Sequence, residues 1–288
     1  MKAFDSIAYS GLLLDKGSAN TAEHYQYRAT LPFTTIKGDV RPTKDGGVIM
    51  CHDPGFTLDA DGRIVRFDKT NCRLILEMTT AECLSLEHAE TFENKHCKVV
   101  CFEAFAHICK ECGKSPFVTV RNERIDTLAP AIIEILSKHD LLEHCVINSF
   151  THATLESFRS LCPTIRLSYV LPLRKVLEKS DVDVAVDFGN CILTTFHFTG
   201  KDAVSGYPIM DASADALAYA AIKGVKVYQA QVGSTIDLTI WFTAATPVPR
   251  CSFISSKSYE KDPFGFHSKG IFYQYSLRTL MSFRMGMR

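Results

Sequence analysis

Residues 37–54 read Lys-Gly-Asp-Val-Arg-Pro-Thr-Lys-Asp-Gly-Gly-Val-Ile-Met-Cys-His-Asp-Pro, and this stretch carries the strongest signal in the chain. Side chains alternate between the two faces of a strand, so Lys37 and Asp39 are expected on the same face. The Asp-Gly-Gly run in the middle is typical of a tight turn that leads into a second strand over residues 48–51. The stretch therefore predicts a hairpin that ends with His52 close to Asp39.

Short apolar runs alternate along the rest of the chain with segments whose apolar residues recur every three or four positions. The first pattern is typical of buried strands and the second of amphipathic helices, and their alternation predicts an α/β fold with a parallel sheet. The expected strands cover residues 6–10, 35–40, 117–120, 145–148, 166–170, 191–196, 225–230 and 251–254. The expected helices cover residues 102–112, 128–139, 151–161 and 213–223. Residues 53–72 are too rich in turn formers for a helix and are interpreted as a loop.

The stretch 37–54 closely resembles the signature of the glycerophosphodiester phosphodiesterase family. In that family Glu-x-Asp-Val-x-x-Thr-Lys-Asp-Gly leads through a short apolar strand to a His-Asp pair. The resemblance covers about residues 5–255 and implies a (β/α)₈ TIM barrel of the phospholipase-C-like phosphodiesterase type. It also implies a hydrolase of lipid metabolism that cleaves glycerophosphodiesters with a divalent metal, Mg²⁺ or Ca²⁺. We expect the barrel at residues 1–255 and a C-terminal extension packed on it at residues 256–288.

The resemblance also implies a role for individual residues. His52 corresponds to the family's acid/base in phosphodiester cleavage, and Asp39 to one of its metal ligands. The sequence departs from the pattern at three other positions, where Tyr9 replaces the first catalytic His and Lys37 and Thr119 replace two metal-binding Glu residues. Because Mg²⁺ and Ca²⁺ need several oxygen ligands, these changes predict an incomplete metal site.

A cation is expected to take the place of the missing metal. An ammonium group that points into the barrel would be costly without a partner, so we expect Lys37 to pair with Asp39. Lys37 and Arg121 would then attract a phosphate, the lysine as a point charge and the arginine through two parallel hydrogen bonds. The sequence predicts a small phosphodiester or phosphate as the ligand.

Length and charge limit the other possibilities. The chain has 288 residues, 46% of them hydrophobic, and a barrel of roughly 250 residues would use most of it. Its 32 basic and 32 acidic residues cancel, so a nucleic-acid-binding surface is not expected. No apolar run approaches the ~18 residues of a membrane-spanning helix, and the first residues lack the apolar core of a signal peptide. We therefore expect a cytoplasmic protein.

Cysteine is abundant, with 11 residues spread over the expected strands and helices. This distribution favours reduced, buried thiols over a disulfide framework. Cys109 and Cys112 have CxxC spacing, but they fall on an expected helix and have no second pair at a matching turn, so a zinc site is the weaker interpretation. The aromatic residues after position 256 favour a cover for the core, although a homodimer interface is an alternative.

Three functional hypotheses remain open at this point. The first is a phosphoric diester hydrolase that uses His52, with His197 as a possible substitute for the missing acid. The second is a catalytically inactive barrel that binds phosphate esters or a partner protein. The third is a changed chemistry in which Lys37 acts as a cation or a nucleophile.

Overall fold

The computed structural model describes residues 7–8, 20–31, 33–172, 175–198, 214–232 and 241–243. Residues Met1–Pro247 cluster as one compact unit and Val248–Arg288 as a second. The second unit lies entirely outside the described residues. The expected strand over 251–254 and the expected extension over 256–288 therefore lie outside them. The division at residue 255 stays a prediction.

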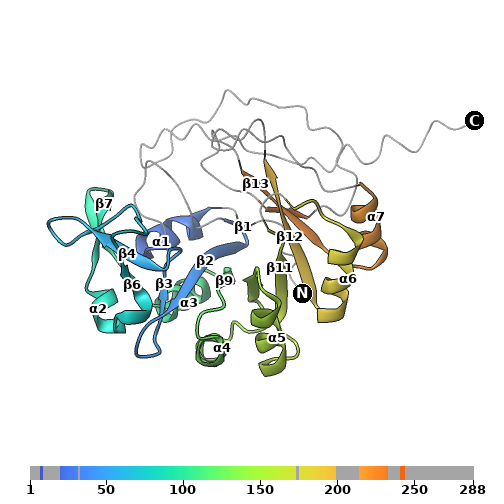
Figure 1. Ribbon diagram of the computed structural model, residues 1–288, viewed down its shortest axis with the longest axis horizontal. Helices are drawn as coiled ribbons and strands as arrows, with labels where there is room; N and C mark the ends of the chain where they lie inside the picture. Colours follow the sequence, from blue (N-terminus) through green and yellow to red (C-terminus); the bar gives the residue numbers. More distant parts are fainter. Residues whose placement is uncertain are drawn as a thin grey trace, which may run out of the picture. The chain divides into compact units, whose positions relative to one another are not determined.

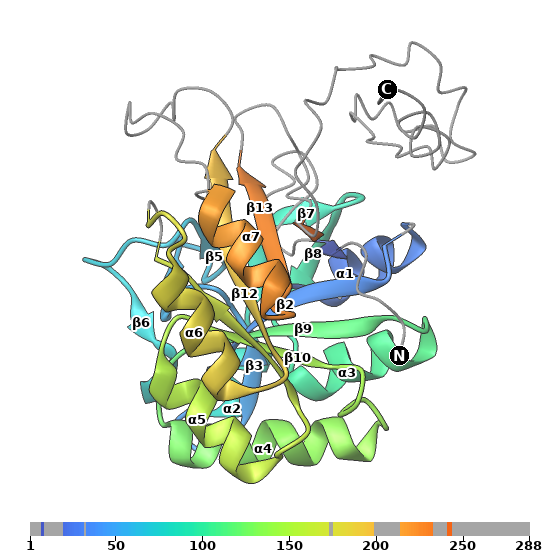
Figure 2. The same cartoon turned by 90° about the vertical axis from the view of Figure 1, so that its right-hand side faces the viewer.

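Seven parallel strands lie side by side in the order in which they occur along the chain (Figures 1 and 2). They are β1 (Ile7–Ala8), β2 (Thr35–Pro42), β9 (Ser115–Val120), β10 (Val146–Ser149), β11 (Arg166–Val170), β12 (Cys191–Phe198) and β13 (Val227–Val232). Two antiparallel partners join the sheet, β3 (Val48–Met50) beside β2 and β14 (Trp241–Thr243) beside β13. Within the described residues the path runs from β1 to β14 without closing. Parallel neighbours in sequence order are the arrangement of a (β/α)₈ barrel, as predicted.

Six helices connect successive strands of this sheet. They are α1 (Ala22–Thr30), α3 (Phe102–Glu111), α4 (Ile125–Lys138), α5 (His152–Leu161), α6 (Lys179–Phe188) and α7 (Ala214–Ile222). Their apolar sides share one core with the outer face of the sheet, where Ile36, Val118, Ile147, Leu167 and Leu193 are all buried. The opposite face of the sheet is therefore the inner one, and it carries the polar residues described below.

The predicted helices correspond to α3, α4, α5 and α7, with bounds that agree within three residues. The prediction missed α1 and α6. In α6 the run Val182-Asp183-Val184 alternates like a strand, and in α1 the buried residues are His24, Tyr25 and Arg28 rather than aliphatic ones. In α6 the apolar spacing that identifies a helix from sequence is limited to Val182, Ala185 and Val186, which the alternation obscures.

An insertion between β3 and α3 forms a small sheet of its own. Its strands are β4 (Gly55–Leu58), β5 (Ile64–Val65), β6 (Arg73–Leu74), β7 (Glu87–Phe92) and β8 (Lys95–Lys98), in the order β6-β4-β5-β7-β8. Phe56, Ile75 and Met78 lie in a separate core under it, beside the 3₁₀ helix η1 (Ile75–Glu77) and α2 (Thr80–Leu84). No helix lies within residues 53–72, as predicted, but the loop expected there is interrupted by β4 and β5. Strands of two to four residues are too short to show a period-two pattern.

None of the helices within the described ranges is both long enough and apolar enough to cross a bilayer.

Candidate functional site

The predicted hairpin is present and places His52 beside β2. Strand β2 pairs with β3 in antiparallel register, Val40 opposite Met50. The backbone N–H of Cys51 then donates to the carbonyl of Asp39 at 2.9 Å, which fixes the position from which His52 leaves the strand. The reversal needs Gly46, whose φ of +85° lies in the left-handed region that glycine adopts without strain.

Lys37 and Asp39 form a closed ion pair on the inner face of β2. The Lys37 Nζ lies 2.7 Å from Asp39 Oδ1 and 2.8 Å from Oδ2, so the ammonium donates to both carboxylate oxygens. The two side chains are only 4% and 6% exposed. This is the pair expected from the sequence. In the interior each charge depends on the other, because a single buried charge without its partner is strongly unfavourable.

The neighbouring strands continue this polar inner face. Thr119 of β9 lies opposite Asp39, and Asn148 of β10 lies opposite Thr119. The Asn148 Nδ2 donates to Thr119 Oγ1 at 3.0 Å, and both residues are 2% exposed. Further round the sheet, the hydroxyls of Ser168 and Thr194 are 2.8 Å apart. Asn148 was missed from the sequence, although a single amide within an apolar strand signals an inward polar position.

Arg41 connects the hairpin to the end of β9. Its Nε donates to the His52 carbonyl at 3.2 Å, its Nη2 donates to the same oxygen, and its Nη1 pairs with Glu123. Arg41 is 7% exposed, so these contacts are shielded from water. Arg124 adds a second connection, because its Nη1 donates to the Lys44 carbonyl at 2.9 Å. The residues after β9 are thus held against the His52 end of the hairpin.

His52 and Arg121 occupy the rim formed by these contacts. The His52 side chain is 53% exposed, and its Nδ1 lies 3.0 Å from Asp53 Oδ1. Arg121 is half-buried and its guanidinium carbon lies 4.8 Å from the centre of the Phe150 ring. Arg41 contacts the backbone of His52 and the side chain of Glu123, two residues after Arg121, so both predicted residues belong to one end of the sheet.

The hairpin is also anchored to the insertion by Asp45. Its carboxylate accepts hydrogen bonds from the Thr43 hydroxyl at 2.7 Å, the Thr80 hydroxyl at 2.8 Å and the Thr80 N–H at 2.9 Å. These three donors lower the pKa of Asp45 to about 2. The contacts therefore favour the ionised carboxylate and fix the turn that precedes β3.

The residues at this site do not fit a divalent cation. Both oxygens of Asp39 already accept from the Lys37 ammonium, and the Thr119 hydroxyl already accepts from Asn148. Mg²⁺ and Ca²⁺ need about six or more oxygen ligands. Across the part of the chain that the structure describes, no three His, Cys, Asp or Glu side chains are grouped to hold a metal.

The structure describes some, but not all, of the other residues singled out from the sequence. Tyr9 and the side chain of His197 lie outside the described residues. Cys109 is buried within α3 and Cys112 is exposed at the end of that helix. Burial raises the pKa of the Cys109 thiol, which disfavours the thiolate that a zinc ion would need.

Comparison with known proteins identifies the fold. No family model and no curated protein sequence matches the chain. Among solved structures, a protein described as a glycerophosphoryl diester phosphodiesterase from Silicibacter pomeroyi is 16% identical, with a TM-score of 0.61 over 78% of this chain and 82% of that one. A glycerophosphodiester phosphodiesterase from Parabacteroides distasonis is 16% identical, with a TM-score of 0.57 over 78% and 83%.

A third structure has a ligand named with it. It is an Oleispira antarctica phosphodiesterase in complex with the product sn-glycerol-3-phosphate, 18% identical, with a TM-score of 0.55 over 77% of this chain and 90% of that one. At such identities the similarity establishes the fold. The chain therefore has the α/β fold of the glycerophosphodiester phosphodiesterases, and the resemblance read from residues 37–54 is confirmed at that level.

Proposed function

We propose that this chain is a phosphate-ester-binding protein with the glycerophosphodiester phosphodiesterase fold, in which metal-dependent hydrolysis has been lost. The ion pair between Lys37 and Asp39 carries this proposal, because the ammonium holds both oxygens of a carboxylate predicted to bind a metal. An enzyme of this chemistry would need that carboxylate for a cation. Here the pair is closed and buried.

The remaining charges on the rim suit an anionic ligand. The charges of Lys37 and Asp39 cancel each other, so this pair adds no net positive charge with which to attract a phosphate. Arg121 is the main candidate for direct contact with a phosphate, since its planar guanidinium can donate two parallel hydrogen bonds and already stacks on Phe150. His52 is exposed at the same end of the sheet and would add a hydrogen bond.

Hydrolysis is disfavoured by the loss of its proton donor as well as its metal. The residue at the position of the family's first catalytic His is Tyr9, whose unperturbed pKa of about 10 makes it a weak acid at neutral pH. Among the described residues, Arg121 and His52 are the groups that would neutralise developing charge on the phosphate. Both groups also bind a phosphate ester in its ground state, and equal binding of substrate and transition state does not accelerate a reaction.

One observation favours a second candidate function, a slow phosphodiesterase that works without metal. His52 Nδ1 lies 3.0 Å from the Asp53 carboxylate. A carboxylate at Nδ1 stabilises the tautomer whose lone pair is on Nε2, which is the arrangement of a general base. Arg41 holds the backbone of the same histidine. Measurement of turnover separates this candidate from a binding protein.

The experiment combines binding with turnover on the full-length chain. Calorimetric titration with sn-glycerol 3-phosphate is expected to give saturable binding that Arg121→Met weakens by about tenfold or more, because the variant loses two charged hydrogen bonds. Arg63→Met is the matched control, because Arg63 is a partly exposed arginine of the insertion. Hydrolysis of bis(p-nitrophenyl) phosphate is expected to be absent with and without Mg²⁺. Hydrolysis that His52→Ala abolishes would establish the slow phosphodiesterase instead.

The free thiols of the chain bear on its cellular location. Cys109 and Cys145 are buried as free thiols, and such thiols persist in a reducing compartment. We propose a cytoplasmic location on this ground.

A further inference from the structure

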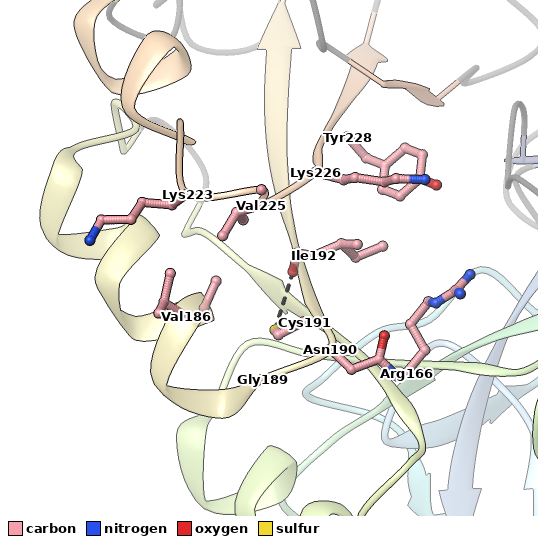
Figure 3. Close-up of a pocket in the computed structure, with 12 residues that line it drawn as sticks. Arg166, Val186, Gly189, Asn190, Cys191, Ile192, Lys223, Val225, Lys226 and Tyr228 are labelled. Atoms are coloured by element: carbon pink, nitrogen blue, oxygen red, sulfur yellow. Dashed lines mark hydrogen bonds between the residues drawn. The ribbon is translucent and has the colours of Figure 1, made fainter. Parts of the chain in front are cut away.

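A second candidate site lies at the opposite edge of the sheet, where the strands begin. It is a pocket of about 380 Å³ between the ends of α6 and α7 and the first residues of β11, β12 and β13 (Figure 3). His52 follows the hairpin at the carboxyl end of β2, whereas Arg166 and Cys191 are the first residues of β11 and β12. Parallel strands all begin at one edge, so the pocket is separate from the rim that carries His52.

The charged side chains of this pocket are all basic. Three of its twelve lining residues are cations, namely Arg166, Lys223 and Lys226, and none is acidic. Figure 3 shows Arg166, Lys226 and Tyr228 on one side of β12, with Lys223 on the other side. Lys223 lies over the Tyr219 ring, 5.4 Å from its centre. Among the described residues no ion pair involves Lys226.

The strand register explains why two of the cations converge. Ser168 and Thr194 meet on the inner face through their hydroxyls, so Arg166, two residues earlier on β11, begins the same face. Leu193 lies opposite Val227, which places Lys226, the residue before β13, next to Ile192 of β12. Arg166 at the start of β11 and Lys226 just before β13 thus face inward on the two sides of β12.

The carbonyl groups at the end of α6 would repel an anion if they were free, because a helix ends in partial negative charge. Arg159 occupies two of them here. Its Nε donates to the Phe188 carbonyl at 3.0 Å and its Nη2 donates to the Gly189 carbonyl. The end of α6 therefore contributes Val186 and Gly189 to the pocket with these two acceptors already bonded to a cation.

We infer that this pocket binds a small organic phosphate, with the phosphate at Arg166 and Lys226 and the apolar part of the ligand along Ile192 and Tyr228, which lie on the same side of β12 as these two cations (Figure 3). Two converging cations match a dianionic phosphate better than a single carboxylate, since arginine donates in parallel and lysine adds a point charge. The volume is within the range of small-molecule sites. This inference does not depend on the function proposed for the rim.

The test is an NMR titration of the full-length chain with phenyl phosphate, followed at the backbone amides of Gly189 and Gly224. Both glycines line the pocket, so their resonances report on this site alone. Saturable shifts are expected, with a midpoint that Lys226→Met raises by about tenfold. Lys179→Met is the matched control, because that lysine also lies over the Tyr219 ring but does not line the pocket, and its midpoint is expected to stay unchanged.

Two further titrations test whether binding is specific to this pocket and to a phosphate. Arg121→Met should leave the Gly189 and Gly224 midpoints unaltered, because it removes a residue of the other end of the sheet. Benzoate, a carboxylate of similar size, should bind more weakly than phenyl phosphate. The inference is overturned if these glycines show no saturable shift, if Lys226→Met binds as tightly as the unmodified chain, or if benzoate binds as well as the phosphate.

Discussion

Removal of one partner from the Lys37–Asp39 pair should destabilise the fold strongly. In Asp39→Ala the Lys37 ammonium would remain at a position that is 4% exposed. Breaking a buried pair in this way costs about 3–5 kcal/mol, whereas an exposed pair contributes about 0–1 kcal/mol. Because both side chains are shielded from water, we expect the free energy of unfolding to fall by the amount typical of a buried pair, about 3–5 kcal/mol.

The double variant Lys37→Met/Asp39→Leu distinguishes pairing from packing. It removes both charges and keeps apolar volume, so it should be much more stable than Asp39→Ala and within about 1–2 kcal/mol of the unmodified chain. Urea denaturation followed by circular dichroism measures all three free energies. Glu103→Ala is the control, because it breaks the exposed pair with Lys138 and should cost less than about 1 kcal/mol. A loss below about 1 kcal/mol in Asp39→Ala, or a double variant no more stable than Asp39→Ala, would refute a closed buried pair.

Two further changes test how the rim is held. Arg41→Met should lower the free energy of unfolding by about 2 kcal/mol, because it removes buried hydrogen bonds to the His52 carbonyl and to Glu123. Equal urea midpoints for the variant and the parent would show that these contacts do not support the fold. Asp45 has a pKa lowered to about 2 from an ordinary value near 3.9, so its contribution to folding is present above about pH 4 and is lost as the pH falls towards 2. Asp45→Asn should flatten that part of the stability profile measured by thermal unfolding, and an unchanged acid slope would contradict the assignment.

The sequence predicted the parallel strands and the hairpin because these segments obey local rules. The run from Lys37 to Pro54 has an alternating strand, a glycine turn and a second strand, and each of these depends on nearby residues alone. The inward position of Lys37 beside Asp39 followed from the same alternation. Such features can be predicted from sequence because they need no knowledge of distant parts of the chain.

Features that depend on tertiary contacts were not predicted. Helix α1 buries Tyr25 and Arg28, and in helix α6 the alternation of valine and aspartate obscures a short apolar stripe formed by Val182 and Ala185. Arg41 could have been found by extending the parity of Lys37 and Asp39 by two residues. Its partners could not, because Glu123 is 82 positions away in the sequence. The charged pocket at the start of β11–β13 likewise forms only when separate strands meet.

Metal binding tests the central claim most directly. The full-length chain is dialysed against Ca²⁺ or Mg²⁺, and the bound metal per chain is measured beside Lys37→Glu/Thr119→Glu, which restores two carboxylates next to Asp39. We expect the unmodified chain to take up no ion at this position and the double variant to take up one. An ion bound by the unmodified chain and lost in Asp39→Asn would show that the Lys37 ammonium does not close the site.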